Sequence, residues 1–140
     1  MLGRGVQDSA KAIAKDFNTT VNRAATLVYT ETAHAASMAQ KAGFEELGVE
    51  EFEIVATLDN VTSEICQEMD GKHLPMSEFI AGVTAPPFHP NCRSVTAPYL
   101  DDEYIELTGD RTRAARDPET GKTVYVEKMT YPRMEKGVCG

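Results

Sequence analysis

Spacing of apolar residues in the amino-terminal part of the chain predicts two helices. Apolar side chains recur three and four positions apart over residues 8–17, where Asp8 or Ser9 is suited to cap the helix. A polar stretch at 18–20 separates this helix from a longer one, which is predicted over residues 21–47 and stopped by Gly48. We therefore expect two helices joined by a short polar loop.

After Glu51 the period of the pattern changes to two. Buried positions of a strand are predicted at Phe52, Ile54, Ala56 and Leu58. A short helix capped by Thr62 or Ser63 follows and ends near Met69, and the Asp70–Gly71 turn leads to further strands near residues 72–75 and 93–97. The pattern predicts an α+β fold: two amino-terminal helices, one of them long, pack on a small, mostly antiparallel sheet with a short helix and an irregular proline-rich loop.

The amino-acid composition of the chain changes near residue 100. Residues 101–140 are more polar, with a clear turn at 117–121 and one further strand expected at 123–126. Residues 129–140 offer little to bury. We expect a domain over residues 1–100 and a polar carboxy-terminal extension over residues 101–140.

Composition and charge narrow the possible functions. The 140 residues suit one domain, and 14 basic against 22 acidic residues give a net charge of -8. Nine of the carboxylates lie between residues 45 and 70, where no lysine or arginine occurs. This charge argues against a helix-turn-helix protein and against sequence-specific binding to nucleic acid. No stretch approaches the roughly 20 apolar residues of a membrane span, and no secretory signal is recognised, so we expect a cytosolic protein.

Two cysteines and a histidine form the most informative chemical pattern. Prolines at 86, 87 and 90 stiffen the backbone around His89 and Cys92, which are three residues apart, and Cys66 lies on the short helix. Thiolates with an imidazole favour Zn²⁺ over Mg²⁺ or Ca²⁺. A closed zinc site needs a fourth ligand, for which His73 and Asp59 are candidates, with Asp70 or a water as further alternatives. Two alternatives stay open from the residues alone: Cys66 and Cys92 pack as small buried side chains, or they form a disulfide. The third cysteine, Cys139, stands outside this pattern.

Signatures of catalysis are incomplete. Glu31 and His34 are three residues apart on the long helix, and with Asp59 they form an acid/base set if the fold brings them together. The sequence lacks the glycine-rich phosphate loop, the dinucleotide-binding motif, the serine-hydrolase elbow and the His-Glu-x-x-His zinc motif. No enzyme is therefore expected, and a metal-dependent hydrolase or nuclease that uses the cysteine–histidine cluster is the alternative.

A series of short motifs resembles the phage Mu protein F-like minor head protein family. The motifs are Thr-Glu at 30–31, Ala-Thr-Leu-Asp at 56–59, Thr-Ser-Glu-Ile-Cys at 62–66, Asp-Gly at 70–71 and Pro-Pro-Phe-His-Pro-Asn-Cys-Arg at 86–93. The motif residues besides the cluster are Thr30, Glu31, Thr57, Asp59, Thr62, Asp70, Gly71, Pro87, Pro90 and Arg93. Many members of the family carry further cysteines at the places of Ser63 and Ser94, where they complete a four-ligand metal site.

The resemblance implies a function as well as a fold. It implies a minor capsid component of a phage or prophage that acts in head morphogenesis and procapsid assembly near the portal, with portal and capsid proteins as partners. Such a protein is made in the host cytoplasm and then enters the procapsid or virion. Members are usually longer than this chain, which therefore resembles the carboxy-terminal domain of the family.

Overall fold

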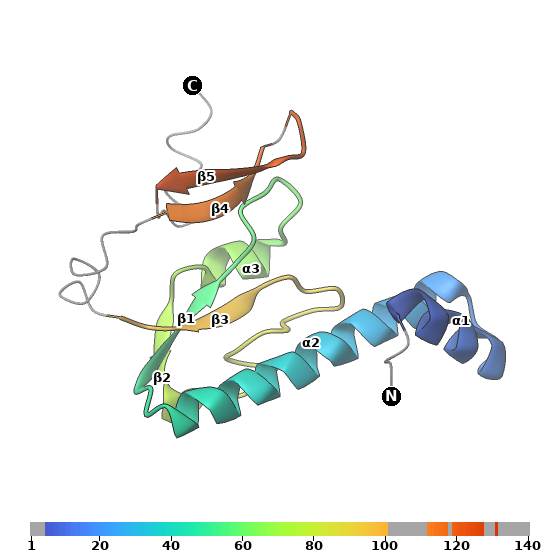
Figure 1. The fold of residues 1–140 in the computed structure, drawn as a ribbon, viewed down its shortest axis with the longest axis horizontal. Helices are drawn as coiled ribbons and strands as arrows, with labels where there is room; N and C mark the ends of the chain where they lie inside the picture. The colour runs from blue at the N-terminus through green and yellow to red at the C-terminus, as the bar shows by residue number, and fades with distance from the viewer. Residues whose placement is uncertain (1–4, 101–111, 118, 128–130, 132–140) are drawn as a thin grey trace.

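The fold is α+β, as the sequence predicts. The computed structural model describes residues 5–100, 112–117, 119–127 and 131. Figure 1 shows two helices along one side, a three-stranded antiparallel sheet with a short helix beside it, and a separate hairpin at the carboxy-terminal end. None of the described helices is both long and apolar enough to cross a membrane.

Helices α1 (Val6–Asp16) and α2 (Val21–Glu46) form a hairpin of their own. The side chain of Thr20 caps α2 by accepting a hydrogen bond from the amide of Arg23 at 3.3 Å. Helix α1 begins at Val6, earlier than the polar residues at 8 and 9 predict, and Gly5 is its N-cap. The two helices meet through small buried side chains at Ala10, Ala14 and Ala24, and Figure 1 shows α1 beside the amino-terminal end of α2, away from the sheet.

Strand β1 (Glu51–Val55) is the centre of the larger sheet. It pairs antiparallel with β2 (His73–Pro75) on one side and with β3 (Val95–Pro98) on the other. Phe52 and Ile54 are fully buried, and the ring of Phe52 lies 4.6 Å from that of Phe79, which follows the 3₁₀ helix η1 (Met76–Glu78). Phe44 joins this core from the end of α2. The sheet therefore packs on the carboxy-terminal half of the long helix.

The first strand ends earlier than the alternating pattern predicts. Ala56 and Leu58 are buried as expected, but Ala56 donates its amide hydrogen to a side-chain oxygen of Asp70 at 2.8 Å. Leu58 forms a single parallel bridge with Ala115. The backbone groups of Ala56 and Leu58 therefore have partners outside the three-stranded sheet, and the chain leaves this sheet after Val55. The short helix α3 (Glu64–Met69) follows, with Ser63 as its N-cap residue.

Strands β4 (Thr112–Arg116) and β5 (Thr123–Glu127) form the carboxy-terminal hairpin. The sequence predicts β5 but not β4, whose residues do not alternate between apolar and polar. The amide of Arg116 donates to the carbonyl of Leu58 at 2.9 Å, which joins this hairpin to the body of the fold. The domain boundary at residue 100 stays a prediction. Most of segment 129–140 lies outside the described residues, but Tyr131 is described and is buried, contrary to the expectation that this segment has little to bury.

Candidate metal centre

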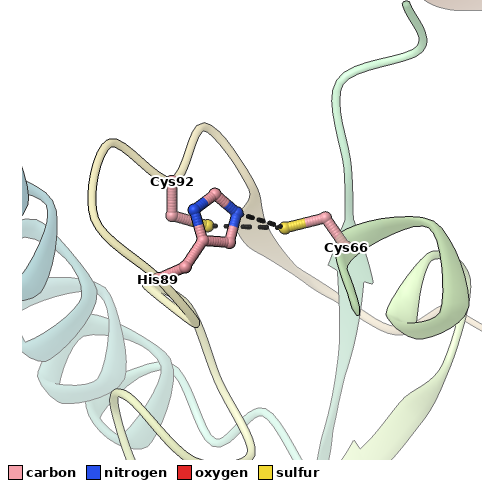
Figure 2. Close-up of side chains that lie close together, drawn as sticks. All are labelled: Cys66, His89 and Cys92. Atoms are coloured by element: carbon pink, nitrogen blue, oxygen red, sulfur yellow. Dashed lines mark hydrogen bonds between the residues drawn. The ribbon is translucent and has the colours of Figure 1, made fainter. Parts of the chain in front are cut away.

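Cys66, His89 and Cys92 come together, as their spacing predicts. Cys66 lies on α3, whereas His89 and Cys92 lie on the proline-rich loop that precedes β3, and Figure 2 shows the three side chains converging. Pro86 and Pro87 are buried at the start of this loop. The amide of Cys92 donates to the carbonyl of His89 at 3.1 Å, so both side chains are presented by one tight turn.

Helix α2 holds this turn from the other side. Asn91 lies between the two ligands in the left-handed backbone region, with a φ of 58°. Its amide donates to Oγ1 of Thr30 at 3.2 Å, and its side-chain Nδ2 donates to Oγ1 of Thr26 at 3.3 Å. The motif residue Thr30 therefore fixes the position of the turn that carries His89 and Cys92.

Distances within the cluster fit a tetrahedral metal. The Cys66 Sγ lies 3.6 Å from the Cys92 Sγ and 3.2 Å from His89 Nε2, and all three ligand atoms lie within 4.8 Å of one another. Zinc bonds of about 2.3 Å to sulfur and 2.0 to 2.1 Å to nitrogen place two tetrahedral sulfurs about 3.8 Å apart and sulfur and nitrogen about 3.6 Å apart. The two pairs that include Cys66 lie within about 0.4 Å of these separations.

The ring of His89 is held in the form that a metal needs. Its Nδ1 lies 2.8 Å from the carbonyl oxygen of Pro90, which only accepts hydrogen bonds, so Nδ1 carries the proton. Nε2 is then unprotonated in the neutral ring and faces Cys66, with Ser63 Oγ at 2.8 Å. A carbonyl on the far nitrogen is the usual way in which proteins orient a metal-ligating histidine.

Burial keeps Cys66 protonated when no metal is bound. Desolvation raises the pKa of the Cys66 thiol, and neighbouring Cys92 raises it further, whereas the hydroxyls of Ser63 and Ser94 act in the opposite direction. Both thiols are free in the structure. A metal must therefore displace protons to bind here, as is general for thiolate ligands.

Ser63 and Ser94 lie beside the cluster. The Ser94 side chain is buried, and its Oγ meets no described polar atom in hydrogen-bond geometry, although it lies near enough to Cys66 to lower the pKa of that thiol. Ser63 and Ser94 therefore place two hydroxyl groups beside the Cys66 thiol.

Neither expected fourth ligand joins the cluster. Among the described residues, the converging ligand atoms belong to Cys66, His89 and Cys92 alone. His73 Nδ1 instead lies 2.8 Å from a carboxylate oxygen of Glu51 on the sheet, and the His73 ring stacks on Tyr99 with 4.0 Å between ring centroids.

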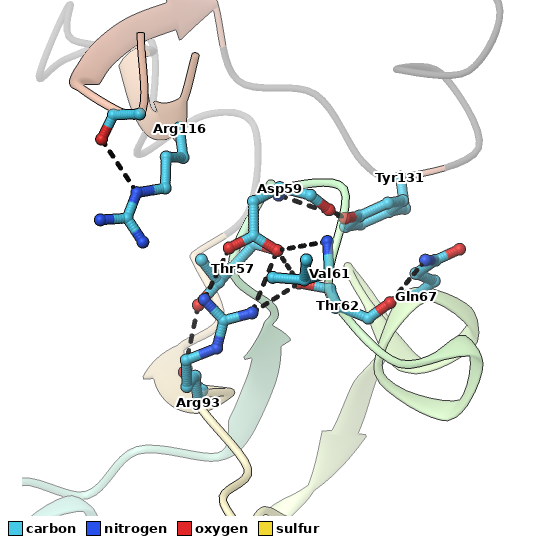
Figure 3. Close-up of polar contacts among 9 residues, drawn as sticks. Thr57, Asp59, Val61, Thr62, Gln67, Arg93, Arg116 and Tyr131 are labelled. Carbon is cyan, nitrogen blue, oxygen red and sulfur yellow. Dashed lines mark hydrogen bonds and ion pairs between the residues drawn. The ribbon is translucent and has the colours of Figure 1, made fainter. Parts of the chain in front are cut away.

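Asp59 is the centre of a separate polar network (Figure 3). Arg93 donates from both terminal nitrogens to the two oxygens of this buried carboxylate, at 2.6 and 3.0 Å. The hydroxyl of Thr62 lies within hydrogen-bond distance of Asp59, at 2.8 Å, and of the carbonyl oxygen of Thr57, at 2.6 Å, and donates its single proton to one of them at a time. The pKa of Asp59 is lowered to about 2, mainly by the hydrogen bond from Arg93, while burial acts in the opposite direction. This carboxylate is therefore ionised and fully engaged at neutral pH.

A second buried carboxylate binds the carboxy-terminal segment. Asp70 accepts two hydrogen bonds from Arg113, at 2.6 and 2.9 Å, besides the bond from Ala56. The amide of Tyr131 donates to the same carboxylate at 3.0 Å, and its hydroxyl bonds to the backbone of Asp59. The sequence analysis did not identify Arg113 and Tyr131. Their only sequence signal is that a basic and an aromatic residue stand in an otherwise polar segment.

The acid/base set considered from the sequence is not assembled. Glu31 and His34 are exposed on α2, and within the described part of the chain no hydrogen bond joins either of them to Asp59. Two members of the acidic run between residues 45 and 70, Asp59 and Asp70, are buried and paired with arginine, so they do not belong to an acidic surface. The motif residue Gly71 has a φ of 75°, which the turn after α3 requires.

Comparison with known proteins gives one match. Residues 1–97 match the family model described as Phage Mu protein F like protein. No curated protein and no solved structure gives a significant match. The matched segment contains α1, α2, the first strand of the sheet and the whole cysteine–histidine cluster.

Proposed function

Because this chain belongs to the phage Mu protein F-like family of phage head morphogenesis proteins, we propose that it is a minor head protein that acts in procapsid assembly near the portal. The match over residues 1–97 carries the proposal. Its partners are then the portal and capsid proteins, and it passes from the host cytoplasm into the procapsid or virion.

The way in which the motif residues are used supports a structural role. Asp59 accepts hydrogen bonds from Thr62 and Arg93, and the carbonyl of Arg93 accepts one from Thr57. Asp70 accepts hydrogen bonds from Ala56 and Arg113. A catalytic acid or base needs a lone pair or proton directed at a substrate, whereas these groups are directed at the protein itself. The net charge of -8 is consistent with a protein that contacts other proteins while DNA is packaged close by.

We also propose that Zn²⁺ is bound by Cys66, His89 and Cys92. The geometry of the three ligand atoms and the fixed ring of His89 support it. Bound there, zinc would supply bonds between α3 and the proline-rich loop, two segments that are joined at this point by the contact of Ser63 with His89 and by weak sulfur contacts. The ion then acts as a cross-link that stabilises the fold.

A metal-dependent hydrolase is the second candidate function, and one observation favours it. A pocket of about 220 Å³ opens beside the cluster and includes Ser63, Cys66 and His89 in its lining. Turnover of a hydrolysable ester or phosphodiester that is lost in Cys92→Ala would favour this enzyme over the structural role.

The proposed function is tested by asking whether the chain is found in phage heads. An epitope-tagged chain is produced in a host that makes heads from the same phage or prophage genome, and procapsids are purified with and without the portal protein. We expect the chain to sediment with procapsids and to be lost from particles that lack the portal. A chain that stays entirely outside procapsids contradicts the proposal. A chain that enters equally well without the portal contradicts its placement near the portal.

A further inference from the structure

Three protein ligands leave one vertex of a tetrahedral metal site without a protein donor. In the described part of the chain, none of the other histidine, cysteine or acidic side chains converges with Cys66, His89 and Cys92. Proteins use three ligands where a molecule from solution takes the fourth position and four ligands where the site is closed. The cluster therefore has the donor set of an open site, and this inference rests on the proposed binding of zinc.

A pocket lies beside the cluster. Its volume is about 220 Å³, and its lining includes Ser63, Cys66, His89, Arg93 and Ser94. Two of the three proposed ligands therefore face the same hollow as the two serines. A space of this size holds several water molecules or one small ion.

The pocket is lined by hydrogen-bond donors. Ser63 and Ser94 offer hydroxyl groups beside the cluster, and the Ser94 hydroxyl is buried and has no partner in hydrogen-bond geometry among the described residues. Arg93 also lines the pocket, with its guanidinium paired to Asp59, and none of the described lining residues is acidic. A ligand suited to this place donates a lone pair to the metal and accepts hydrogen bonds from the two serines. Small anions have this character.

We propose that the fourth position of the metal binds a small anion from solution, which enters through this pocket and is held by the hydroxyls of Ser63 and Ser94. With serine at both positions, the fourth ligand of the metal can exchange with solvent. Ser94 acts through the anion, because its hydroxyl is placed to hydrogen-bond a ligand at the open vertex.

Cobalt substitution tests this site with a spectroscopic readout. The full chain is loaded with Co²⁺, and azide is titrated while the visible d–d bands are recorded. We expect about one Co²⁺ per chain and a saturable shift of these bands. Ser94→Ala should retain the metal and weaken the apparent azide affinity by about tenfold or more, as is typical when an outer partner of a metal site is lost. Ser77→Ala, at an exposed serine of η1, is the matched control and should titrate like the parent protein.

Closing the site provides the second test. Ser94→Cys and Ser63→Cys each supply a thiolate, which should strengthen the sulfur-to-cobalt charge-transfer band and abolish the response to azide. If Co²⁺ binds but azide leaves the bands of the parent protein unchanged, the open vertex is refuted while the metal site stands. If less than about a tenth of the chains bind Co²⁺, both the metal site and this inference are refuted.

Discussion

Arg113 binds both carboxylate oxygens of Asp70, whose side chain is fully buried. Arg113 belongs to the hairpin beyond the segment that matches the family, and Asp70 lies inside that segment. The pair therefore fastens one part of the chain to the other at a site that solvent does not reach.

We expect Arg113→Leu to lower the free energy of unfolding by about 3–5 kcal/mol, because it leaves a buried carboxylate without its charged partner. Urea denaturation followed by circular dichroism measures the loss. Arg116→Leu removes an exposed arginine of the same strand and should cost less than about 1 kcal/mol. The double variant Arg113→Leu/Asp70→Asn should lose less stability than the sum of the losses in the two single variants. Equal effects of Arg113→Leu and Arg116→Leu would contradict the buried pair.

Asp59 predicts a dependence of stability on pH. Its pKa is lowered from the ordinary value of 3.8 to about 2 in the folded protein, chiefly by the hydrogen bond from Arg93. Because the folded-state pKa is depressed, this stabilisation is complete above about pH 4 and is lost as the pH falls through 2. Asp59→Asn should lower the free energy of unfolding by about 1–2 kcal/mol at pH 7, since the partly exposed Arg93 weakens the pair.

The difference between Asp59→Asn and the parent protein should shrink as the pH is lowered from 4 to 2. Denaturation curves of both proteins at several pH values in this range measure it. A difference that stays constant over the whole range contradicts the ion pair as the source of stability.

Zinc should be present in protein purified under reducing conditions without added metal. Elemental analysis is expected to give about one zinc per chain, and Cys92→Ala should lose it, because two remaining ligands bind zinc weakly. Chelation of the metal should lower the melting temperature by at least about 5 °C if the ion cross-links α3 to the loop. Cys139→Ala is the matched control and should keep its metal. Absence of zinc from the parent protein contradicts the site.

The left-handed backbone at Asn91 should control metal affinity. Asn91→Val places a β-branched side chain at a φ of 58°, which costs about 1–2 kcal/mol and displaces the turn that carries His89 and Cys92. Asn91→Gly adopts the same backbone freely and loses only the bond to Thr26. Competition with a chelator should show weaker zinc binding for Asn91→Val than for Asn91→Gly. The reverse order contradicts the importance of the turn geometry.

The helical hairpin should open independently of the sheet, because α1 packs on α2 through a separate cluster of alanines. Ala24→Glu places a charge in that cluster and should speed hydrogen exchange in α1 while β1 keeps its protection. Ala42→Glu, at an exposed position of α2, is the control and should change neither. Loss of protection in both α1 and β1 with Ala24→Glu would show that the two clusters form one cooperative unit.

Local patterns predicted most of the fold of the family segment. The alternation from Phe52 to Leu58 correctly identified the buried face, and the spacing of His89 and Cys92 correctly placed them together. The end of β1 at Val55 could not be predicted, since it depends on the side chain of Asp70, 14 residues beyond Ala56. Strand β4 was not predicted because its residues carry no alternating pattern. It is held by its ladder with β5, and by the ion pair of Arg113 and the bridge to Leu58, which depend on residues distant in the chain.

The long separation between Asp70 and its partners sets an order of events during synthesis. Arg113 follows Asp70 by 43 residues and Tyr131 follows it by 61. At translation rates of about 5–20 residues per second, the ribosome takes roughly 2–9 seconds to reach Arg113 and roughly 3–12 seconds to reach Tyr131. During that interval Asp70 lacks the guanidinium and the amide that contact it in the folded chain. The complete set of contacts around this buried carboxylate therefore forms only after both residues have been synthesised.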